Sequence, residues 1–182
     1  MKLWATVAAA GILAGSAIAN DSNTNTMMSG GKWQINVALG LPTGDHSDAG
    51  FDTMYFVGAD WMFGGMSGYS NVSQYFGFLY GFGEGDSNLE STTYGVHYGV
   101  AFGFGQESMS EWTARVQGGF YNTKLDDGTF SDDEWGFGGK AGIFYNPKGS
   151  KWNIGAGYYW YPKVSDGDNT GWFFMFGLPI GN

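Results

Sequence analysis

The feature of this sequence that most constrains its fold is an alternation of large apolar residues with small or polar ones. In residues 93–104, tyrosine, valine and phenylalanine occupy every second position, and glycine, histidine, threonine and alanine lie between them. Successive side chains of a β-strand point to opposite faces of the sheet, so a period of two predicts a strand. Eight such runs follow one another along the chain: residues 32–41, 53–63, 74–83, 93–104, 111–121, 134–145, 151–161 and 171–178.

The length of the runs indicates that the strands cross a membrane. Strands of soluble proteins most often have about five or six residues, whereas a strand that crosses a bilayer at a steep tilt needs about 9 to 11. Most of the runs reach that length, and their even number is typical of single-chain bacterial barrels. The sequence therefore predicts an all-β fold, an eight-stranded antiparallel up-and-down transmembrane β-barrel.

Glycine fills much of the face opposite the large apolar side chains. The chain contains 33 glycines in 182 residues, far more than the roughly 7% of an average protein. Glycine weakens a water-facing strand, but inside a narrow barrel small residues leave room for a few large or charged ones. We therefore expect the apolar face to point outward to lipid and the glycine-rich, polar face to point inward. A soluble, exported β-sandwich with a buried apolar face is the alternative fold.

Tryptophan lies mostly near the ends of the runs. Because successive strands of an antiparallel barrel run in opposite directions, residues at the strand ends form a ring at each end of the barrel. Tryptophan and tyrosine favour the membrane–water interface, since one part of the ring is apolar and another is polar. The predicted membrane-interface aromatic residues include Trp33, Trp61, Trp112, Trp135, Trp152, Trp160 and Trp172.

The start of the chain is typical of a secretory signal peptide. Lys2 supplies a positive charge, a short apolar stretch follows, and a small-x-small cleavage site ends at Ala19. The apolar stretch is shorter than the ~20 residues of a spanning helix. We predict a signal peptide at residues 1–19, a short polar segment at 20–31 and the barrel at 32–182. The absence of cysteine excludes a disulfide framework and is compatible with export.

The connections between runs fall into two classes. With both chain ends in the periplasm, the connections after odd-numbered runs face the cell exterior. We expect these to be the longer loops, and they hold most of the acidic residues: 42–52, 84–92, 122–133 and 162–170. The connections after even-numbered runs are predicted to be periplasmic turns, of which the first is long: 64–73, 105–110 and 146–150. The acidic loops could gather Ca²⁺ or Mg²⁺, which favour oxygen ligands, but solvated loops explain them equally well, so no specific metal site is predicted.

A signal peptide, eight alternating runs, mostly short even connections and longer odd loops together resemble the small outer-membrane β-barrels, the OmpA-, OmpX- and OmpW-like group. The resemblance covers essentially the whole mature chain. It implies a monomer in the outer membrane that contacts lipid and lipopolysaccharide, assembled by periplasmic chaperones and the barrel-assembly machinery. One departure is the ending, because members often finish on an aromatic residue that the machinery reads, whereas here residues 179–182 follow the last run. Phe174 or Phe176 could supply the aromatic signal.

Five ionisable residues fall on the predicted inward face: Asp60, His97, Glu111, Arg115 and Lys140. A charge in a narrow interior is costly unless it is paired. We therefore predict a polar network that fills the barrel and pairs Arg115 with Glu111 or Asp60. A constricted, charge-lined pore is the alternative, although the interior of an eight-stranded barrel is just wide enough for its side chains.

The function predicted from these features is a structural or interaction role at the cell surface. The net charge of −9 excludes nucleic acid as an expected partner. Some eight-stranded barrels act on lipid A with a His-x-Ser arrangement. Here the residue two positions after His97 is Gly99, so the serine nucleophile of that arrangement is missing. The adjacent His46 and Ser47 are weak evidence for a catalytic pair. No catalytic residue, metal or cofactor is predicted. The alternatives are a narrow pore, a route for small apolar molecules and, third, a lipid-modifying enzyme.

Overall fold

The computed structural model describes residues 32–65, 72–104, 112–147 and 150–180 of the chain. Residues 1–31, 66–71, 105–111, 148–149 and 181–182 lie outside the described residues. Four predictions therefore fall outside the described part of the chain: the signal peptide at 1–19, the polar segment at 20–31, the periplasmic turn at 105–110 and the inward placement of Glu111.

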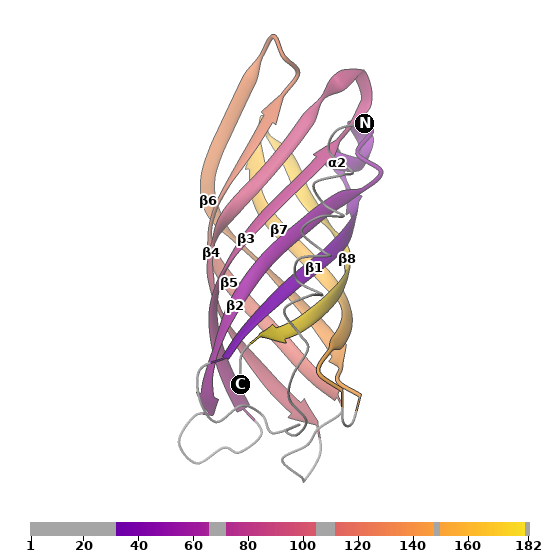
Figure 1. The fold of residues 1–182 in the computed structure, drawn as a ribbon. Helices are drawn as coiled ribbons and strands as arrows, with labels where there is room; N and C mark the ends of the chain where they lie inside the picture. Colours follow the sequence, from indigo (N-terminus) through magenta and orange to yellow (C-terminus); the bar gives the residue numbers. More distant parts are fainter. Residues whose placement is uncertain (1–31, 66–71, 105–111, 148–149, 181–182) are drawn as a thin grey trace.

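Eight antiparallel strands close into a barrel in which β1 pairs with β8, and every other pair joins neighbours in the sequence (Figure 1). The strands are β1 (Lys32–Thr43), β2 (Met54–Gly65), β3 (Val72–Glu84), β4 (Glu90–Phe104), β5 (Trp112–Asp126), β6 (Ser131–Tyr145), β7 (Asn153–Val164) and β8 (Gly167–Ile180). Two short helical segments lie in the connections, α2 (Asp45–Asp48) and η1 (Asp86–Asn88). The predicted eight-stranded up-and-down barrel is confirmed. No helix in the described part of the chain is long and apolar enough to cross a membrane.

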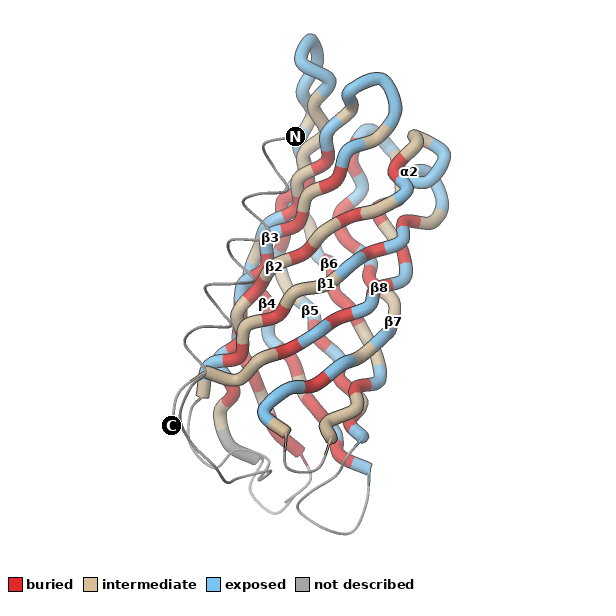
Figure 2. Tube along the Cα trace, turned by 45° about the vertical axis from the view of Figure 1, so that its right-hand side comes forward, coloured by how far each residue is buried: buried red, intermediate tan, exposed pale blue. Residues whose placement is uncertain are grey.

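Buried and exposed residues alternate along the strands (Figure 2), so successive side chains point to the inside and to the outside of the barrel. In β4, for example, Val96 is 49% exposed and the next residue, His97, is 3% exposed. The outward face carries the large apolar side chains, as predicted. The seven tryptophans named above all lie on that face and are 37–56% exposed. Their position at the membrane–water interface stays a prediction.

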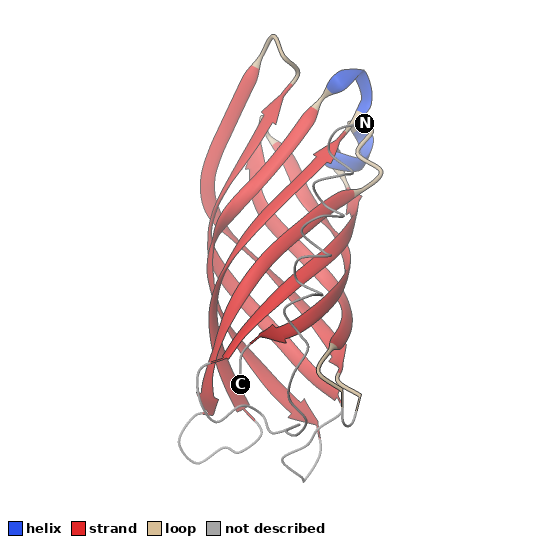
Figure 3. Cartoon of the chain, in the orientation of Figure 1, coloured by secondary structure: helices blue, strands red, loops and turns tan. Residues whose placement is uncertain are grey.

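The outer end of the barrel is defined here as the end with the β1–β2, β3–β4, β5–β6 and β7–β8 connections. Strands extend close to this end (Figure 3), so the prediction of long odd-numbered loops is wrong for all but the first. β5 and β6 pair up to Asp126 and Ser131, and the β3–β4 and β7–β8 ladders also continue beyond their predicted ends. Backbone hydrogen bonds hold such ladders together regardless of which side chains the strands carry. Where both faces of a hairpin meet water, charged side chains are tolerated on them. Acidic residues that we expect in loops, such as Asp132, therefore lie in strands.

The last strand is longer than predicted and includes Pro179. β8 pairs with β1 up to Ile180, whereas its ladder with β7 ends at Gly177. Proline has no backbone N–H and is tolerated where one side of a strand has no ladder to complete. The strand can therefore continue through a residue that sequence patterning places after its end.

The interior of the barrel is more aromatic than the sequence predicts. A buried cluster contains Phe51, Met54, Phe56, Leu79, Tyr121, Phe144, Tyr159, Tyr161, Phe173 and Met175. Glycines on neighbouring strands make room for several of these rings. A Cβ atom at Gly81 would lie 2.4 Å from Phe56 Cδ1, and one at Gly155 would lie 2.2 Å from Phe144 Cδ1. The expectation of a mainly polar interior is thus corrected, because the inward glycines accommodate aromatic rings as well as polar groups.

Candidate functional site

Asp60 and His97 meet inside the barrel although β3 lies between their strands. Oδ1 of Asp60 lies 2.8 Å from Nε2 of His97, and each residue is 3% exposed. Both residues are paired in register with Gly77 of β3. A Cβ atom at Gly77 would lie 2.2 Å from the carboxylate oxygen and 2.7 Å from the imidazole nitrogen. The contact between β2 and β4 therefore depends on glycine at this position of β3.

A chain of hydrogen bonds continues from Asp60 to β7. Asn36 donates through Nδ2 to Oδ2 of Asp60 at 2.7 Å, and Gln34 donates through Nε2 to Oδ1 of Asn36. Asn153 of β7 donates through Nδ2 to Oε1 of Gln34 at 3.3 Å. We call these four residues, together with His97, the polar chain. Gln34, Asn36 and Asn153 were not among the predicted site residues, although polar residues at inward positions of the alternating runs are the signal that identifies them.

Gln117 of β5 joins two buried tyrosines. Tyr75 donates through its hydroxyl to Oε1 of Gln117, and Nε2 of Gln117 donates to the hydroxyl of Tyr121, both at 3.3 Å. The rings of Tyr75 and Tyr121 flank His97, with centroid distances of 6.1 and 6.4 Å. The polar chain and the aromatic cluster therefore form one continuous filling.

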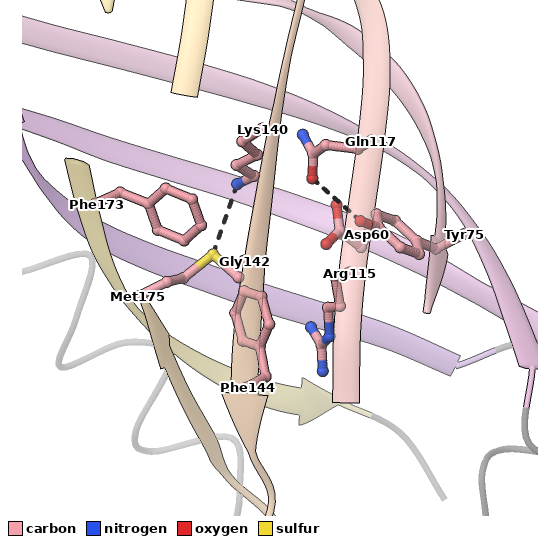
Figure 4. Close-up of a pocket in the computed structure, with 9 residues that line it drawn as sticks. All are labelled: Asp60, Tyr75, Arg115, Gln117, Lys140, Gly142, Phe144, Phe173 and Met175. Atoms are coloured by element: carbon pink, nitrogen blue, oxygen red, sulfur yellow. Dashed lines mark hydrogen bonds between the residues drawn. The ribbon is translucent and has the colours of Figure 1, made fainter. Parts of the chain in front are cut away.

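Arg115 and Lys140 are held by aromatic rings and by sulfur (Figure 4). The guanidinium carbon of Arg115 lies 4.4 Å from the centre of the Phe144 ring. Nζ of Lys140 lies 3.6 Å from Sδ of Met175 and 5.6 Å from the centre of the Phe173 ring. Each cation is 7% exposed, and neither forms an ion pair with another described residue.

The predicted pair between Arg115 and Asp60 is not present. The two carboxylate oxygens of Asp60 already contact Asn36 and His97. The face of an aromatic ring attracts a cation, by about 2 kcal/mol when the pair is desolvated, so Phe144 can partly replace a carboxylate. The other predicted partner, Glu111, lies outside the described residues.

The space between these side chains is closed at the level of the two cations. It is lined by Asp60, Tyr75, Arg115, Gln117, Lys140, Gly142, Phe144, Phe173 and Met175 (Figure 4). This space does not admit a water-sized sphere. A water-filled channel needs a continuous path at least one water molecule wide, so the described residues form a filled barrel here.

His46 lies at the outer end of the interior. Its Nε2 is 3.3 Å from Oγ of Ser91, and its ring stacks on Phe51 with a centroid distance of 5.1 Å. The partner is therefore a serine on β4 and not the adjacent Ser47. Burial lowers the pKa of His46, and a hydrogen bond to the backbone of Asp168 opposes that effect.

Acidic residues at the outer end serve partly to hold the β5–β6 turn. Oδ1 of Asp127 accepts hydrogen bonds from the backbone N–H groups of Thr129 and Phe130, at 2.8 and 2.6 Å. These bonds, led by that from Phe130, lower the pKa of Asp127. Within the described ranges, no group of three or more histidine, aspartate or glutamate side chains is arranged to hold a metal ion.

A closed eight-stranded barrel with an apolar exterior and a filled interior is the architecture of the small outer-membrane β-barrel proteins. The sequence matches no family model and no curated protein sequence. Solved structures of small outer-membrane barrels resemble it in fold. Ail, the attachment invasion locus protein of Yersinia pestis, is 16% identical with a TM-score of 0.52, over 84% of this chain and 100% of Ail.

Two further solved structures with this fold are similarly distant in sequence. Neisserial surface protein A is 13% identical with a TM-score of 0.52, over 84% of this chain and 97% of that one. The N-terminal β-barrel domain of Pseudomonas aeruginosa OprF is 11% identical with a TM-score of 0.52, over 83% of this chain and 100% of that domain. The predicted resemblance to small eight-stranded outer-membrane barrels is confirmed at the level of the fold.

Proposed function

We propose that this protein is a small integral outer-membrane barrel with a closed interior and an acidic outer end, and that it has a structural or interaction role at the cell surface. The fold that it shares with Ail and Neisserial surface protein A supports this proposal, as does its apolar outward face. The proposal includes a monomeric state in contact with lipid and lipopolysaccharide. It also includes assembly by periplasmic chaperones and the barrel-assembly machinery.

The observation that carries the proposal is the filled interior around Arg115 and Lys140. Neither cation borders a space that holds water, and aromatic rings pack against both. A solute that passed through the barrel would have to displace the polar chain and the rings together. A role at the cell surface is therefore favoured over transport through the interior.

Planar-bilayer recordings test the closed interior. We expect no steady single-channel current from the purified barrel, and heat-modifiable migration on a gel should show that the sample is folded. The second candidate function is a narrow anion-selective pore, which the two buried cations without carboxylate partners among the described residues would favour. Steady currents that disappear in Arg115→Ala or Lys140→Ala would support the pore and contradict the closed barrel.

The acidic outer end favours cationic partners over anionic ones. Ail has been determined in complex with the heparin analogue sucrose octasulfate. In this chain the outer part of the β5–β6 hairpin carries Asp126, Asp127, Asp132 and Asp133, and negative charge there repels a polyanion. We therefore expect no binding of sucrose octasulfate to the barrel in neutral lipid nanodiscs by calorimetry, and measurable binding would contradict this part of the proposal.

Catalysis is not part of the proposed function. The contact between His46 and Ser91 resembles a base beside a nucleophile, but the two residues are 2% and 1% exposed and lie inside the barrel. Lipid A from cells that overproduce the protein should have an unaltered mass spectrum. A new lipid A species that disappears in Ser91→Ala would contradict this expectation.

A further inference from the structure

The β1–β2 connection, residues 44–53, folds over the outer end of the interior, and we call it the lid. Its helix α2 packs against β1 and β8 at that end (Figures 1 and 3). Phe51 of the lid is 1% exposed and belongs to the aromatic cluster. Gly44 and Gly50 flank α2 with φ angles of +64° and +80°, in the left-handed region that favours glycine. The lid is thus a discrete segment with a glycine turn on each side of its helix and one ring inserted into the barrel.

His46 is the buried polar contact between the lid and the barrel wall. It is 2% exposed, it stacks on Phe51 within the lid, and its Nε2 lies 3.3 Å from Oγ of Ser91 on β4. An uncharged imidazole suits this position, because one side of the ring meets an aromatic face and one nitrogen meets a hydroxyl. A charged imidazole would keep its hydrogen bond to the backbone of Asp168 on β8 and could donate to the hydroxyl of Ser91. It would nevertheless lose its hydration and, among the described residues, gain no carboxylate hydrogen bond in return.

The charged groups around His46 are already engaged elsewhere. Asp45 of α2 accepts a hydrogen bond from the backbone N–H of Asp168 at 2.8 Å, and the carboxylate of Asp168 on β8 pairs with Lys163 of β7 at 2.6 Å. The side chain of Asp86 of η1 packs against Gly50 of the lid. These carboxylates therefore offset a charge on His46 only in part.

We propose that acid releases the lid: a proton taken from solvent by His46 separates α2 and Phe51 from β4 and opens the outer end of the interior. The step changes only the protonation state of the imidazole and needs no other reactant. The two glycine turns allow the segment to move outward as a unit. The polar chain and the two buried cations lie deeper in the barrel and are not part of the lid.

The direction of the pH dependence follows from the burial of His46. Burial lowers its pKa in the closed state, so closing the lid favours the neutral form. The contribution of His46 to the stability of the closed lid is fully present above the ordinary histidine pKa of about 6.5. This contribution is lost as the pH falls through the lower pKa that His46 has in the closed state.

A single-cysteine reporter can measure opening of the lid, because the chain has no native cysteine. Thr123 is 0% exposed and pairs with Thr93, one inward position deeper than Ser91. The reporter is Thr123→Cys in nanodiscs, probed with a membrane-impermeant maleimide. Thr129→Cys, on the exposed β5–β6 turn, corrects for the effect of pH on thiol reactivity. Thr93→Cys serves as a second reporter, and heat-modifiable migration checks the folding of every variant.

We expect the corrected reactivity of the reporter to rise at least about tenfold between about pH 7.5 and about pH 5. His46→Gln should abolish this rise, and Phe51→Ala should make the reporter reactive at both pH values. Asp45→Asn should move the midpoint to lower pH, whereas its matched control Asp48→Asn, an exposed acid on the same helix, should not.

Three outcomes would overturn the proposal. The first is an unchanged pH dependence in His46→Gln. The second is an unreactive reporter at both pH values while Phe51→Ala reacts. The third is an unreactive reporter in Phe51→Ala, which would mean that the lid does not control access to the interior.

Discussion

Replacing Gly77 with alanine tests whether the contact between Asp60 and His97 depends on the absence of a side chain between them. The new Cβ atom would lie 2.2 Å from Oδ1 of Asp60, 2.6 Å from the backbone oxygen of Ala59 and 2.7 Å from Nε2 of His97. The two side chains would therefore have to separate, and β2 would have to shift slightly against β3. The separation removes a hydrogen bond to a charged group, worth about 1.5–3 kcal/mol, and overpacking adds about 1–3 kcal/mol. We expect Gly77→Ala to lower the free energy of unfolding by roughly 2.5–6 kcal/mol.

Urea unfolding in phospholipid vesicles, followed by tryptophan fluorescence, measures this loss. The matched control is Gly118→Ala, the same change in the middle of β5. A Cβ atom at Gly118 would lie 3.9 Å from the carbonyl oxygen of Gly138, which is an ordinary van der Waals contact. The control should therefore stay within about 1 kcal/mol of the wild type.

Equal unfolding free energies for the two alanine variants would refute this reasoning. It would also be refuted if Gly77→Ala left the imidazole NMR signals of His97 unchanged, because the contact with Asp60 would then have survived the added methyl group.

Two further predictions concern Phe144 and Asp127. Phe144→Leu removes the ring next to Arg115 and should lower the free energy of unfolding by about 2–3 kcal/mol, since a desolvated cation–π contact and ring packing are both lost; an unchanged urea midpoint would contradict it. The carboxylate of Asp127 has a lowered pKa in the folded turn, so its contribution is present above the unfolded value and is lost as the pH falls through the folded one. The amide NMR shifts of Thr129 and Phe130 should therefore titrate together below the ordinary aspartate pKa, and shifts that do not change in acid would contradict that assignment.

The fold could be predicted from the sequence because the evidence for it lies in residues that are neighbours in the chain. The alternation around His97 requires only that neighbouring side chains of a strand point to opposite faces, and the run lengths distinguish a membrane strand from a soluble one. The ends of the strands were less accessible. Asp126 and Ser131 form a ladder pair although charge and turn-forming residues predict a loop there, because backbone hydrogen bonding does not depend on side-chain polarity.

The side-chain contacts across the interior of the barrel could not be predicted from the sequence. The inward position of Arg115 was predicted, but its contact with the ring of Phe144 depends on how far each strand is shifted against the next when the barrel closes. The contact of His46 could not be predicted either, because His46 lies in α2 of the lid and reaches Ser91 on β4 only when the lid folds over the outer end.

The sequence by itself therefore determined the number of strands and the face on which each side chain lies, since both follow from a period of two along a single strand. The tertiary structure alone decided which inward side chains touch. In the closed barrel, Asp60 contacts His97 because Gly77 between them has no side chain, and Arg115 packs on the ring of Phe144. The physical reason is that contacts inside a barrel join strands far apart in the sequence. The positions of these strands along the barrel axis relative to one another are set only when the sheet closes.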